Sequence, residues 1–194
     1  MKPLPQLYLA SQSPRRAALL QQMGVDFEVV SVAVDETMLD AETPEGCARR
    51  LAKEKARAGW RALNPGRQRP VLGADTIVIA ADSVMGKPAD RQQAIAMLQT
   101  LSGTTHEVVT AVALAADHES VCSQRSRVTF RTLTRQECEA YWDSGEPRDK
   151  AGAYAIQGLA AMFITRLDGS YSGVMGLPLY ETTELLKTFG IQVL

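Results

Sequence analysis

The chain has 194 residues, of which 45% are hydrophobic and 22% are charged, a composition typical of one globular domain with a buried core. The formal net charge of −1 at pH 7 argues against a surface that binds nucleic acid through its phosphates. No apolar run reaches the length of a membrane span, and the three cysteines lack the spacing of a zinc site or a disulfide framework. The sequence therefore predicts a single cytoplasmic domain over residues 1–194 that binds neither membrane nor nucleic acid.

Segments typical of strands and of helices alternate along the chain, which indicates an α/β fold. In the first half we expect strands at 7–10, 27–34 and 71–80, and helices at 14–23 and 44–63. In the second half we expect helices after the capping pairs Asp90/Gln93 and Thr134/Glu137, a hairpin of 106–115 with 121–132, and a last helix at 179–189. A second hairpin is expected around the turn Asp168-Gly169, with strands at 161–167 and 171–174.

The turn that runs from Ser11 to Arg16 places two arginines in the first turn of a helix. The helix dipole disfavours cations there, and a bound phosphate would resolve the conflict. Serine hydroxyls, free backbone amides and the guanidinium groups of Arg15 and Arg16 all bind polyphosphate. The alternative is that both arginines point into water and that Ser13 merely caps the helix. The turn alone leaves both interpretations open.

Asp75 interrupts the apolar segment 71–80, whose residues predict a strand that is covered on both faces. A buried, ionised carboxylate without a partner is costly, so we expect Asp75 to be paired, metal-bound or protonated. The structural alternative is a carboxylate at the end of a strand that accepts hydrogen bonds from backbone N–H groups. Thr76 is expected to point to the opposite face, because side chains alternate along a strand.

Three further charged segments could belong to the same site. Lys55 falls on the apolar stripe of its helix and could reach an anionic ligand, although such lysines more often extend along the surface to water. Lys87 follows a predicted turn and could reach the same ligand, and its alternative is a solvated loop lysine. Asp35 and Glu36 are adjacent loop carboxylates, which are typical of hard-metal ligands but also of ordinary solvated loops.

The segment 149–158 contains closely spaced glycines, which let the backbone approach a ligand. The amide of Gln157 offers one donor and one acceptor, a match for the adjacent O4 and N3–H of uracil or thymine. The competing explanation is a turn in which a buried Gln157 bonds to backbone, and the segment alone slightly favours that explanation.

Together these motifs resemble the Maf family of nucleoside triphosphate pyrophosphatases, and most of all its dTTP/UTP branch. The resemblance rests on Ser11-x-Ser13-Pro14-Arg15-Arg16, Lys53-Glu54-Lys55-Ala56, Gly73-Ala74-Asp75-Thr76, Lys87-Pro88 and the segment 149–158, in the same order over nearly the whole chain. It implies a two-lobed α/β fold with a mixed β-sheet, related to inosine triphosphate pyrophosphatases. It also implies a nucleotide in a central cleft between the lobes, and a homodimer.

The resemblance implies roles for individual residues as well. Asp75 would be the proton acceptor. The residues linked to substrate choice are Arg15, Thr76 and Gln157, and those expected to bind the phosphates are Ser11, Arg16, Lys55 and Lys87. A divalent metal cation, Mg²⁺ or Mn²⁺, is expected at Glu36 and Asp75, because the available ligands are oxygens.

The expected reaction is hydrolysis of dTTP, UTP and modified pyrimidine triphosphates to the monophosphate and pyrophosphate, a house-cleaning activity. Gln157 favours pyrimidines, because the sister branch that prefers 7-methyl-GTP is expected to carry Glu there, and a carboxylate cannot donate to a pyrimidine O4. Three alternatives stay open. They are a 7-methyl-GTP pyrophosphatase of the sister branch, a non-catalytic nucleotide-binding regulator of septum formation, and a sugar phosphatase that would release orthophosphate.

Overall fold

The computed structural model describes residues 4–81 and 83–193. The strands are β1 (Leu7–Leu9), β2 (Phe27–Val29), β3 (Val71–Ala80), β4 (Ser83–Met85), β5 (Thr105–Ala115), β6 (Glu119–Phe130) and β7 (Ile164–Asp168). The α-helices are α1 (Pro14–Gln22), α2 (Pro44–Ala62), α3 (Arg91–Leu101), α4 (Arg135–Asp143), α5 (Tyr171–Met175) and α6 (Leu179–Lys187). The 3-10 helices are η1 (Pro65–Arg67), η2 (Ala151–Ala153) and η3 (Leu159–Phe163).

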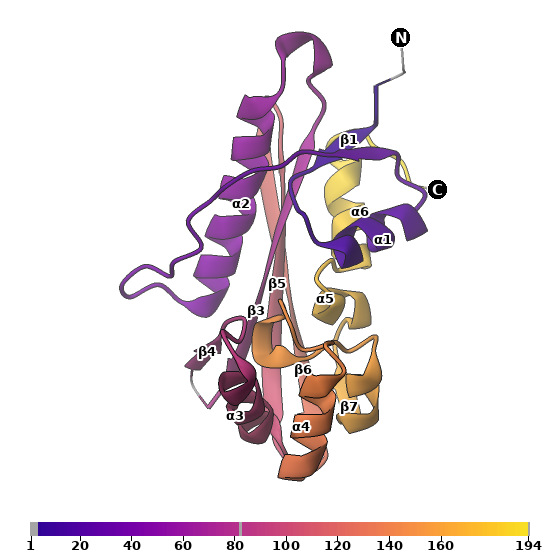
Figure 1. Ribbon diagram of the computed structural model, residues 1–194. Coiled ribbons are helices and arrows are strands. Elements are labelled where there is room, and N and C mark those ends of the chain that lie inside the picture. Colours follow the sequence, from indigo (N-terminus) through magenta and orange to yellow (C-terminus); the bar gives the residue numbers. More distant parts are fainter. Residues whose placement is uncertain (1–3, 82, 194) are drawn as a thin grey trace. The chain divides into compact units, whose positions relative to one another are not determined.

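Within the described residues, seven strands form one sheet in the order β2-β1-β3-β5-β6-β7, with β4 paired to β3 off this path (Figure 1). Strand β1 is parallel to β2 and β3, whereas the pairs β3–β4 and β6–β7 are antiparallel. The predicted α/β fold with a mixed sheet is therefore confirmed. None of the helices in 4–81 and 83–193 combines the length and the apolar character that a membrane crossing requires.

Two compact units divide the described chain. The first contains residues 4–75, 110–124 and 176–193, and the second contains 76–109 and 125–175, apart from the undescribed residue 82. Strands β3, β5 and β6 each contribute residues to both units. The expectation of one two-lobed domain over 1–194 stays a prediction, and its positions 1–3, 82 and 194 lie outside the described residues.

Two predicted strand regions differ in the structure. Strand β2 ends at Val29, because its parallel partner β1 offers only three residues for pairing. The predicted hairpin around Asp168-Gly169 is wrong: β7 begins only at Ile164, and the segment 171–174 belongs to helix α5. Ser170 accounts for this helix, since its Oγ accepts a hydrogen bond of 2.9 Å from the N–H of Gly173 and so satisfies an amide that a helix start leaves free.

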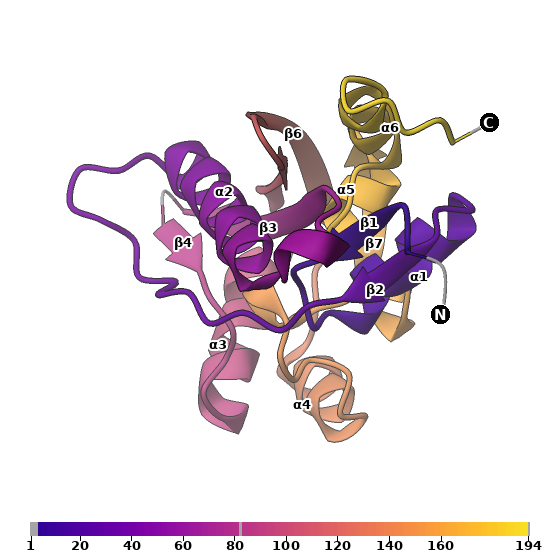
Figure 2. The ribbon, with the colours of Figure 1, turned by 90° about the horizontal axis from the view of Figure 1, so that it is seen from above.

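Helix α2 packs against β3 through small residues of the first unit (Figure 2). Ala52 and Ala56 are fully buried. A Cβ atom on Gly73 would lie 2.6 Å from the backbone nitrogen of Ala56 and would also overlap the carbonyl oxygen of Ala52. One turn further on, a Cβ on Gly59 would lie 2.6 Å from Cγ1 of Val71. The two glycines therefore permit the short distance between helix and strand.

We expect Gly73→Ala to lower the free energy of unfolding by about 2 kcal/mol, because the added methyl group meets backbone atoms that cannot move aside. Urea unfolding of the variant and the wild type measures this change. Gly66→Ala is the matched control, since a Cβ at Gly66 would meet no atom within 4 Å. Equal unfolding midpoints for Gly73→Ala and the wild type would contradict this account of the packing.

A buried histidine lies in the aromatic core of the second unit. His106 is 2% exposed, and its Nε2 lies 2.8 Å from the hydroxyl oxygen of Tyr154. Its ring meets the ring of Phe130 edge to face, with centroids 5.1 Å apart. Burial lowers the pKa of His106 from 6.5 to about 4, because the surrounding apolar groups disfavour the charged imidazolium. His106 is therefore neutral in the folded protein near neutral pH.

Acid should destabilise the fold through His106. The unfolded chain takes up a proton near pH 6.5 and the folded chain only near pH 4, so this residue costs stability increasingly as the pH falls from 6.5 towards 4. We expect it to remove about 2 kcal/mol of stability between pH 7 and pH 5. His106→Gln replaces the imidazole with an amide that can still form hydrogen bonds but does not titrate. Urea unfolding at both pH values should therefore show a smaller loss of stability in the variant. An equal loss in both proteins would contradict the prediction.

Candidate functional site

A buried ammonium group joins two carboxylates in the first unit. The Nζ atom of Lys55 donates to Oδ1 of Asp75 over 2.8 Å and to Oε1 of Glu36 over 2.6 Å. Lys55 and Asp75 are 9% and 8% exposed, whereas the side chain of Glu36 is 53% exposed. Of the three states expected for Asp75, the structure shows the paired one, with an ammonium group as the partner. The alternative in which Lys55 extends into water is wrong.

The packing of α2 explains how Lys55 reaches Asp75. Lys55 lies on the buried stripe of α2, between the small residues Ala52 and Ala56. Gly73 and Asp75 share one face of β3, because side chains two residues apart point the same way. Since Gly73 lets the helix backbone come close to that face, the ammonium group of Lys55 meets the carboxylate two residues further along the strand.

The turn before α1 also lies in the first unit, and its Arg16 points to protein partners. Nε of Arg16 donates to the carbonyl oxygen of Gly176 over 2.8 Å, and a terminal nitrogen donates to Oγ of Ser11 over 3.1 Å. The same Ser11 oxygen accepts from the N–H of Ser13 over 3.3 Å. Ser13 occupies the N-cap position, but its side chain forms no capping hydrogen bond. The alternative in which both arginines point into water and Ser13 caps the helix is therefore wrong.

The electrostatics of Arg16 connect this turn with the buried pair. Burial lowers the pKa of the Arg16 guanidinium, the negative charge of Asp75 raises it, the positive charge of Arg15 lowers it, and Glu36 raises it. Arg15 is partly buried, and the first turn of α1 contains no acidic side chain. Five predicted site residues of the first unit therefore lie in one electrostatic neighbourhood: Arg15, Arg16, Glu36, Lys55 and Asp75. Ser11 lies beside them as a hydrogen-bond acceptor.

The other predicted site residues lie in the second unit, on segments that adjoin one another. They are Thr76, Lys87 and Gln157. The N–H of Gly152 donates to the carbonyl oxygen of Gly86 over 3.1 Å, which ties the segment of Gln157 to the turn of Lys87. A Cβ on Gly152 would lie 3.0 Å from Cγ1 of Val78, and Val78 is two residues from Thr76 on the same face of β3.

Gln157 and Lys87 are both exposed, and neither side chain forms a hydrogen bond or ion pair with the part of the chain that the structure describes. The explanation in which a buried Gln157 bonds to backbone is therefore wrong. Its amide is available to a ligand. For Lys87, the solvated loop lysine and the phosphate-binding lysine both agree with this exposure. Thr76 is partly buried.

The residue that holds the segment of Glu36 is not conspicuous in the sequence. Arg50 on α2 donates from Nε to Glu42 over 2.8 Å, from a terminal nitrogen to the other Glu42 oxygen over 2.9 Å, and to the carbonyl oxygen of Thr37 over 3.0 Å. The hydrogen bond from Arg50 lowers the pKa of Glu42 to about 2. The spacing of Arg50 and Glu54, four residues apart on a helix, predicts an ion pair from the sequence. The contact of Arg50 with Glu42 follows no such spacing, so the sequence does not predict it.

The metal expected at Glu36 and Asp75 stays a prediction, and only the chemistry of the donor atoms supports it. In the described chain, no three or more His, Cys, Asp or Glu residues converge as a metal site. Glu36 and Asp75 supply two carboxylates that share the Lys55 ammonium. Mg²⁺ is commonly held by one or two carboxylates together with substrate phosphates and water. Two carboxylates near the arginine turn thus fit a cation that takes its remaining ligands from a phosphorylated substrate.

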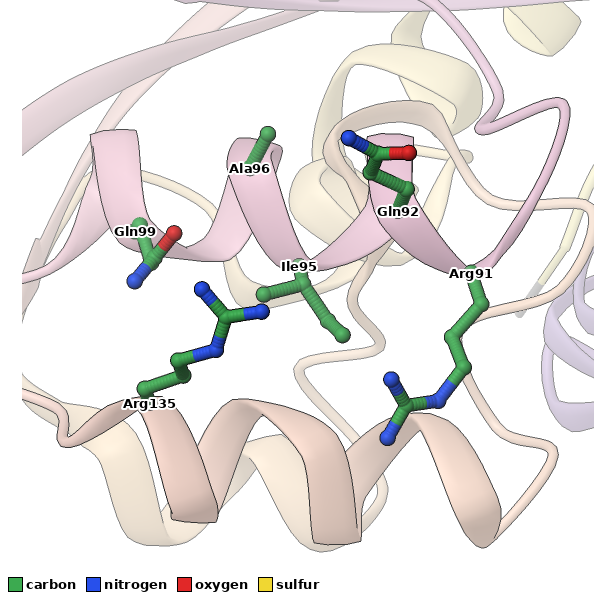
Figure 3. Close-up of a pocket in the computed structure, with 6 residues that line it drawn as sticks. All are labelled: Arg91, Gln92, Ile95, Ala96, Gln99 and Arg135. Carbon is green, nitrogen blue, oxygen red and sulfur yellow. The ribbon is translucent and has the colours of Figure 1, made fainter.

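A groove between α3 and α4 in the second unit contains none of the predicted site residues (Figure 3). Its volume is about 370 Å³, and it is lined by Arg91, Gln92, Ile95, Ala96, Gln99 and Arg135. Nε of Arg135 lies 2.9 Å from Oε1 of Glu139, and Nε of Arg91 lies 3.8 Å from Oδ1 of Asp143. Because both guanidinium groups already have acidic partners on α4, we assign the groove no catalytic role.

The fold and the charges of the first unit define a class: an α/β protein whose basic side chains gather near a buried carboxylate, Asp75, and an exposed one, Glu36. This arrangement suits a ligand with several phosphates. Comparison with known proteins then identifies the family. Residues 6–189 match the family model described as Maf-like protein, and the chain belongs to the Maf family.

Close relatives extend over almost the whole chain. The chain is 53% identical over 190 residues to the dTTP/UTP pyrophosphatase of Alkalilimnicola ehrlichii, covering 96% of this chain and 94% of that protein. It is 52% identical over 184 residues to the dTTP/UTP pyrophosphatase of Escherichia coli O157:H7, covering 94% of this chain and 92% of that protein.

Among solved structures, the chain is similar to a nucleoside-triphosphatase, or dITP/XTP pyrophosphatase, from Mycobacterium abscessus. The TM-score is 0.41 and the identity 18%, over 66% of this chain and 74% of that one. This similarity is too low to establish a common fold family, so the expected relation to inosine triphosphate pyrophosphatases stays a prediction.

Proposed function

We propose that this protein hydrolyses dTTP and UTP to the nucleoside monophosphate and pyrophosphate. The proposal rests on the buried pair of Lys55 and Asp75. The carboxylate of Asp75 can accept a proton, and the ammonium group of Lys55 places a positive charge beside it. Arg16 lies within electrostatic range of Asp75. The substrate is supported by the relatives named dTTP/UTP pyrophosphatase, which are 53% and 52% identical over nearly the whole chain.

In the proposed reaction, Asp75 accepts a proton from a water molecule, and the water oxygen attacks the α-phosphorus. The bond between the α-phosphorus and the oxygen that bridges to the β-phosphate breaks, and pyrophosphate leaves with that electron pair. Arg16 and Lys55 offset the negative charge that develops on the phosphates. Ser11 and Lys87 are assigned to the same phosphates, Ser11 through its hydroxyl group and Lys87 through its ammonium group.

A divalent cation, Mg²⁺ or Mn²⁺, belongs to the proposal, with Glu36 and Asp75 as its protein ligands. When bound, such a cation polarises phosphate oxygens and offsets their charge. Its support is the oxygen donor set of the two carboxylates.

Base selection is assigned to Gln157, with Arg15 and Thr76 as further residues that affect substrate choice. An exposed amide can donate to O4 and accept from N3–H of uracil or thymine at the same time. Glutamate at this position could only accept, so Gln157 supports pyrimidines over the 7-methyl-GTP alternative. Modified pyrimidine triphosphates that keep O4 and N3–H would satisfy the same amide.

The proposal places the protein in the cytoplasm as a homodimer. The cysteines Cys47, Cys122 and Cys138 are all free thiols, which suits a reducing compartment. Leu159 and Met162 on η3 are 48% and 65% exposed, and such apolar side chains favour association with another protein surface. Sedimentation at several protein concentrations would separate a dimer from a monomer.

A panel assay tests the proposed function. Purified protein is incubated with Mg²⁺ or Mn²⁺ and, separately, with dTTP, UTP, GTP and 7-methyl-GTP, and both pyrophosphate and orthophosphate are counted. We expect pyrophosphate from dTTP and UTP and little from the purine nucleotides. Preference for 7-methyl-GTP would overturn the base assignment, orthophosphate would indicate a phosphatase, and nucleotide binding without turnover would favour the non-catalytic regulator.

A further inference from the structure

We propose that Glu146 is a positioning residue for base selection, because its carboxylate, together with the hydroxyl group of Tyr141, holds the backbone on both sides of Gln157. This inference rests on the proposed function, in which Gln157 recognises the pyrimidine. Glu146 lies just after α4, in the second unit, as does the whole segment that it contacts. The sequence does not single Glu146 out, because a glutamate in the polar segment after α4 has no pattern that distinguishes it from a solvated one.

The carboxylate of Glu146 binds the backbone that follows Gln157. Its Oε2 accepts from the N–H of Leu159 over 2.9 Å, and its Oε1 accepts from the N–H of Ala160 over 3.3 Å. A Cβ atom on Gly158 would overlap all three atoms of this carboxylate group. The carboxylate therefore lies directly against the residue next to Gln157, and only a glycine leaves room for it there.

Tyr141 extends the same support to the backbone that precedes Gln157. Its hydroxyl group donates to Oε1 of Glu146 over 2.7 Å and accepts from the N–H of Ala155 over 3.1 Å. Tyr141 is 3% exposed, and burial followed by the hydrogen bond with Glu146 raises its pKa. The phenol therefore keeps its proton and can continue to donate to Glu146 while it accepts from Ala155.

The segment itself needs such support. Asp149 and Ala153 have φ angles of 58° and 57°, in the left-handed region that side chains other than glycine disfavour. Conformations of this kind persist where the surrounding structure holds them in place. Because the side chain of Gln157 has no partner among the described residues, the position of its amide depends on the backbone that Glu146 and Tyr141 hold.

Base selection depends on this position. Guanine offers the same kind of pair in its O6 and N1–H, but its larger ring system places that pair farther from the sugar. The amide therefore selects uracil or thymine only if it is held where O4 and N3–H lie. A binding site that loses this alignment loses discrimination between bases along with affinity. Glu146 thus acts on the reaction through Gln157 and without touching the substrate.

Glu146→Gln tests the proposal, since it keeps the size of the side chain but replaces one acceptor oxygen with an NH₂ group. We expect hydrogen exchange of the Leu159 and Ala160 amides to become about 10-fold faster, since each loses a charged acceptor. We expect KM for dTTP and UTP to rise about 10-fold with kcat changed less than about 3-fold, and the preference over GTP to fall about 10-fold. Tyr141→Phe should change the same quantities in the same direction.

Two comparisons distinguish positioning from a general loss of stability. Glu139→Gln is the matched control, because Glu139 is on α4 and pairs with the exposed Arg135. It should leave exchange and base preference unchanged. In a Gln157→Ala background, Glu146→Gln should reduce base preference little further, because the amide through which it acts is gone.

Unchanged base preference in Glu146→Gln, or an additive effect on top of Gln157→Ala, would overturn the proposal. So would unchanged exchange at Leu159 and Ala160. Absence of pyrophosphate release by the wild-type protein would instead overturn the proposed function and the base-selection part of this inference, while the exchange rates would still report whether Glu146 holds the segment.

Discussion

Asp75→Asn is expected to lower the rate of pyrophosphate release from dTTP by about 10³-fold, because an amide cannot accept the proton of the attacking water. The fold should survive, since the amide oxygen of asparagine can still accept the hydrogen bond that Lys55 donates over 2.8 Å. Steady-state release of pyrophosphate and the urea unfolding midpoint, measured on the same preparation, give both quantities.

Asp168→Asn is the matched control for this variant. Asp168 forms an exposed ion pair with Arg127, with side chains 47% and 62% exposed, so the same chemical change there should leave the rate unaltered. If Asp75→Asn kept a rate close to that of the wild type while Asp168→Asn did the same, the assignment of Asp75 as proton acceptor would be wrong.

Lys55→Met is expected to remove most of the turnover and also about 3 kcal/mol of stability. Methionine retains the length and the apolar stem of lysine but removes the ammonium group that is hydrogen-bonded to the buried Asp75. The loss of the hydrogen bond to Glu36 should cost less stability, because this side chain is 53% exposed and water can replace the ammonium group. Pyrophosphate release and urea unfolding again provide the measurements.

A double variant separates the two effects of Lys55. Lys55→Met combined with Asp75→Asn removes both charges, so its stability should be higher than that of Lys55→Met alone. Lys187→Met, which removes a lysine from an exposed pair with Glu184, is the control for the loss of a positive charge. A Lys55→Met protein with wild-type stability would show that the pair is not energetically coupled.

The long elements were predictable because their local signals agree with the packing. The helix α2 has Thr43 as its cap, Pro44 in its first turn and a stripe of buried residues, and the apolar run of β3 forms a buried strand. At α5 the local signals conflict. The turn pair Asp168-Gly169 and the residues after it are compatible with a hairpin, but the Ser170 hydroxyl caps a helix instead, and a sequence does not show which of these hydrogen bonds forms.

The same reasoning accounts for what the sequence revealed of the site. Asp75 was conspicuous because it breaks an apolar strand, and Lys55 because it shares an apolar stripe. The supporting residues Arg50 and Glu146 act through contacts that are distant in sequence, with Glu42 eight and Ala160 fourteen positions away. Their polar side chains lie in segments where polar residues are ordinary, so only the folded chain identifies their partners.

The central claim is that water attacks the α-phosphorus of a pyrimidine triphosphate, and the position of the new oxygen tests it most directly. Hydrolysis of dTTP is carried out in water enriched in ¹⁸O, the products are separated, and their masses are measured by mass spectrometry. The account predicts one ¹⁸O atom in the nucleoside monophosphate and none in the pyrophosphate. Label in pyrophosphate would place the attack on the β-phosphorus, label in orthophosphate would indicate stepwise removal of phosphates, and either result would contradict the account.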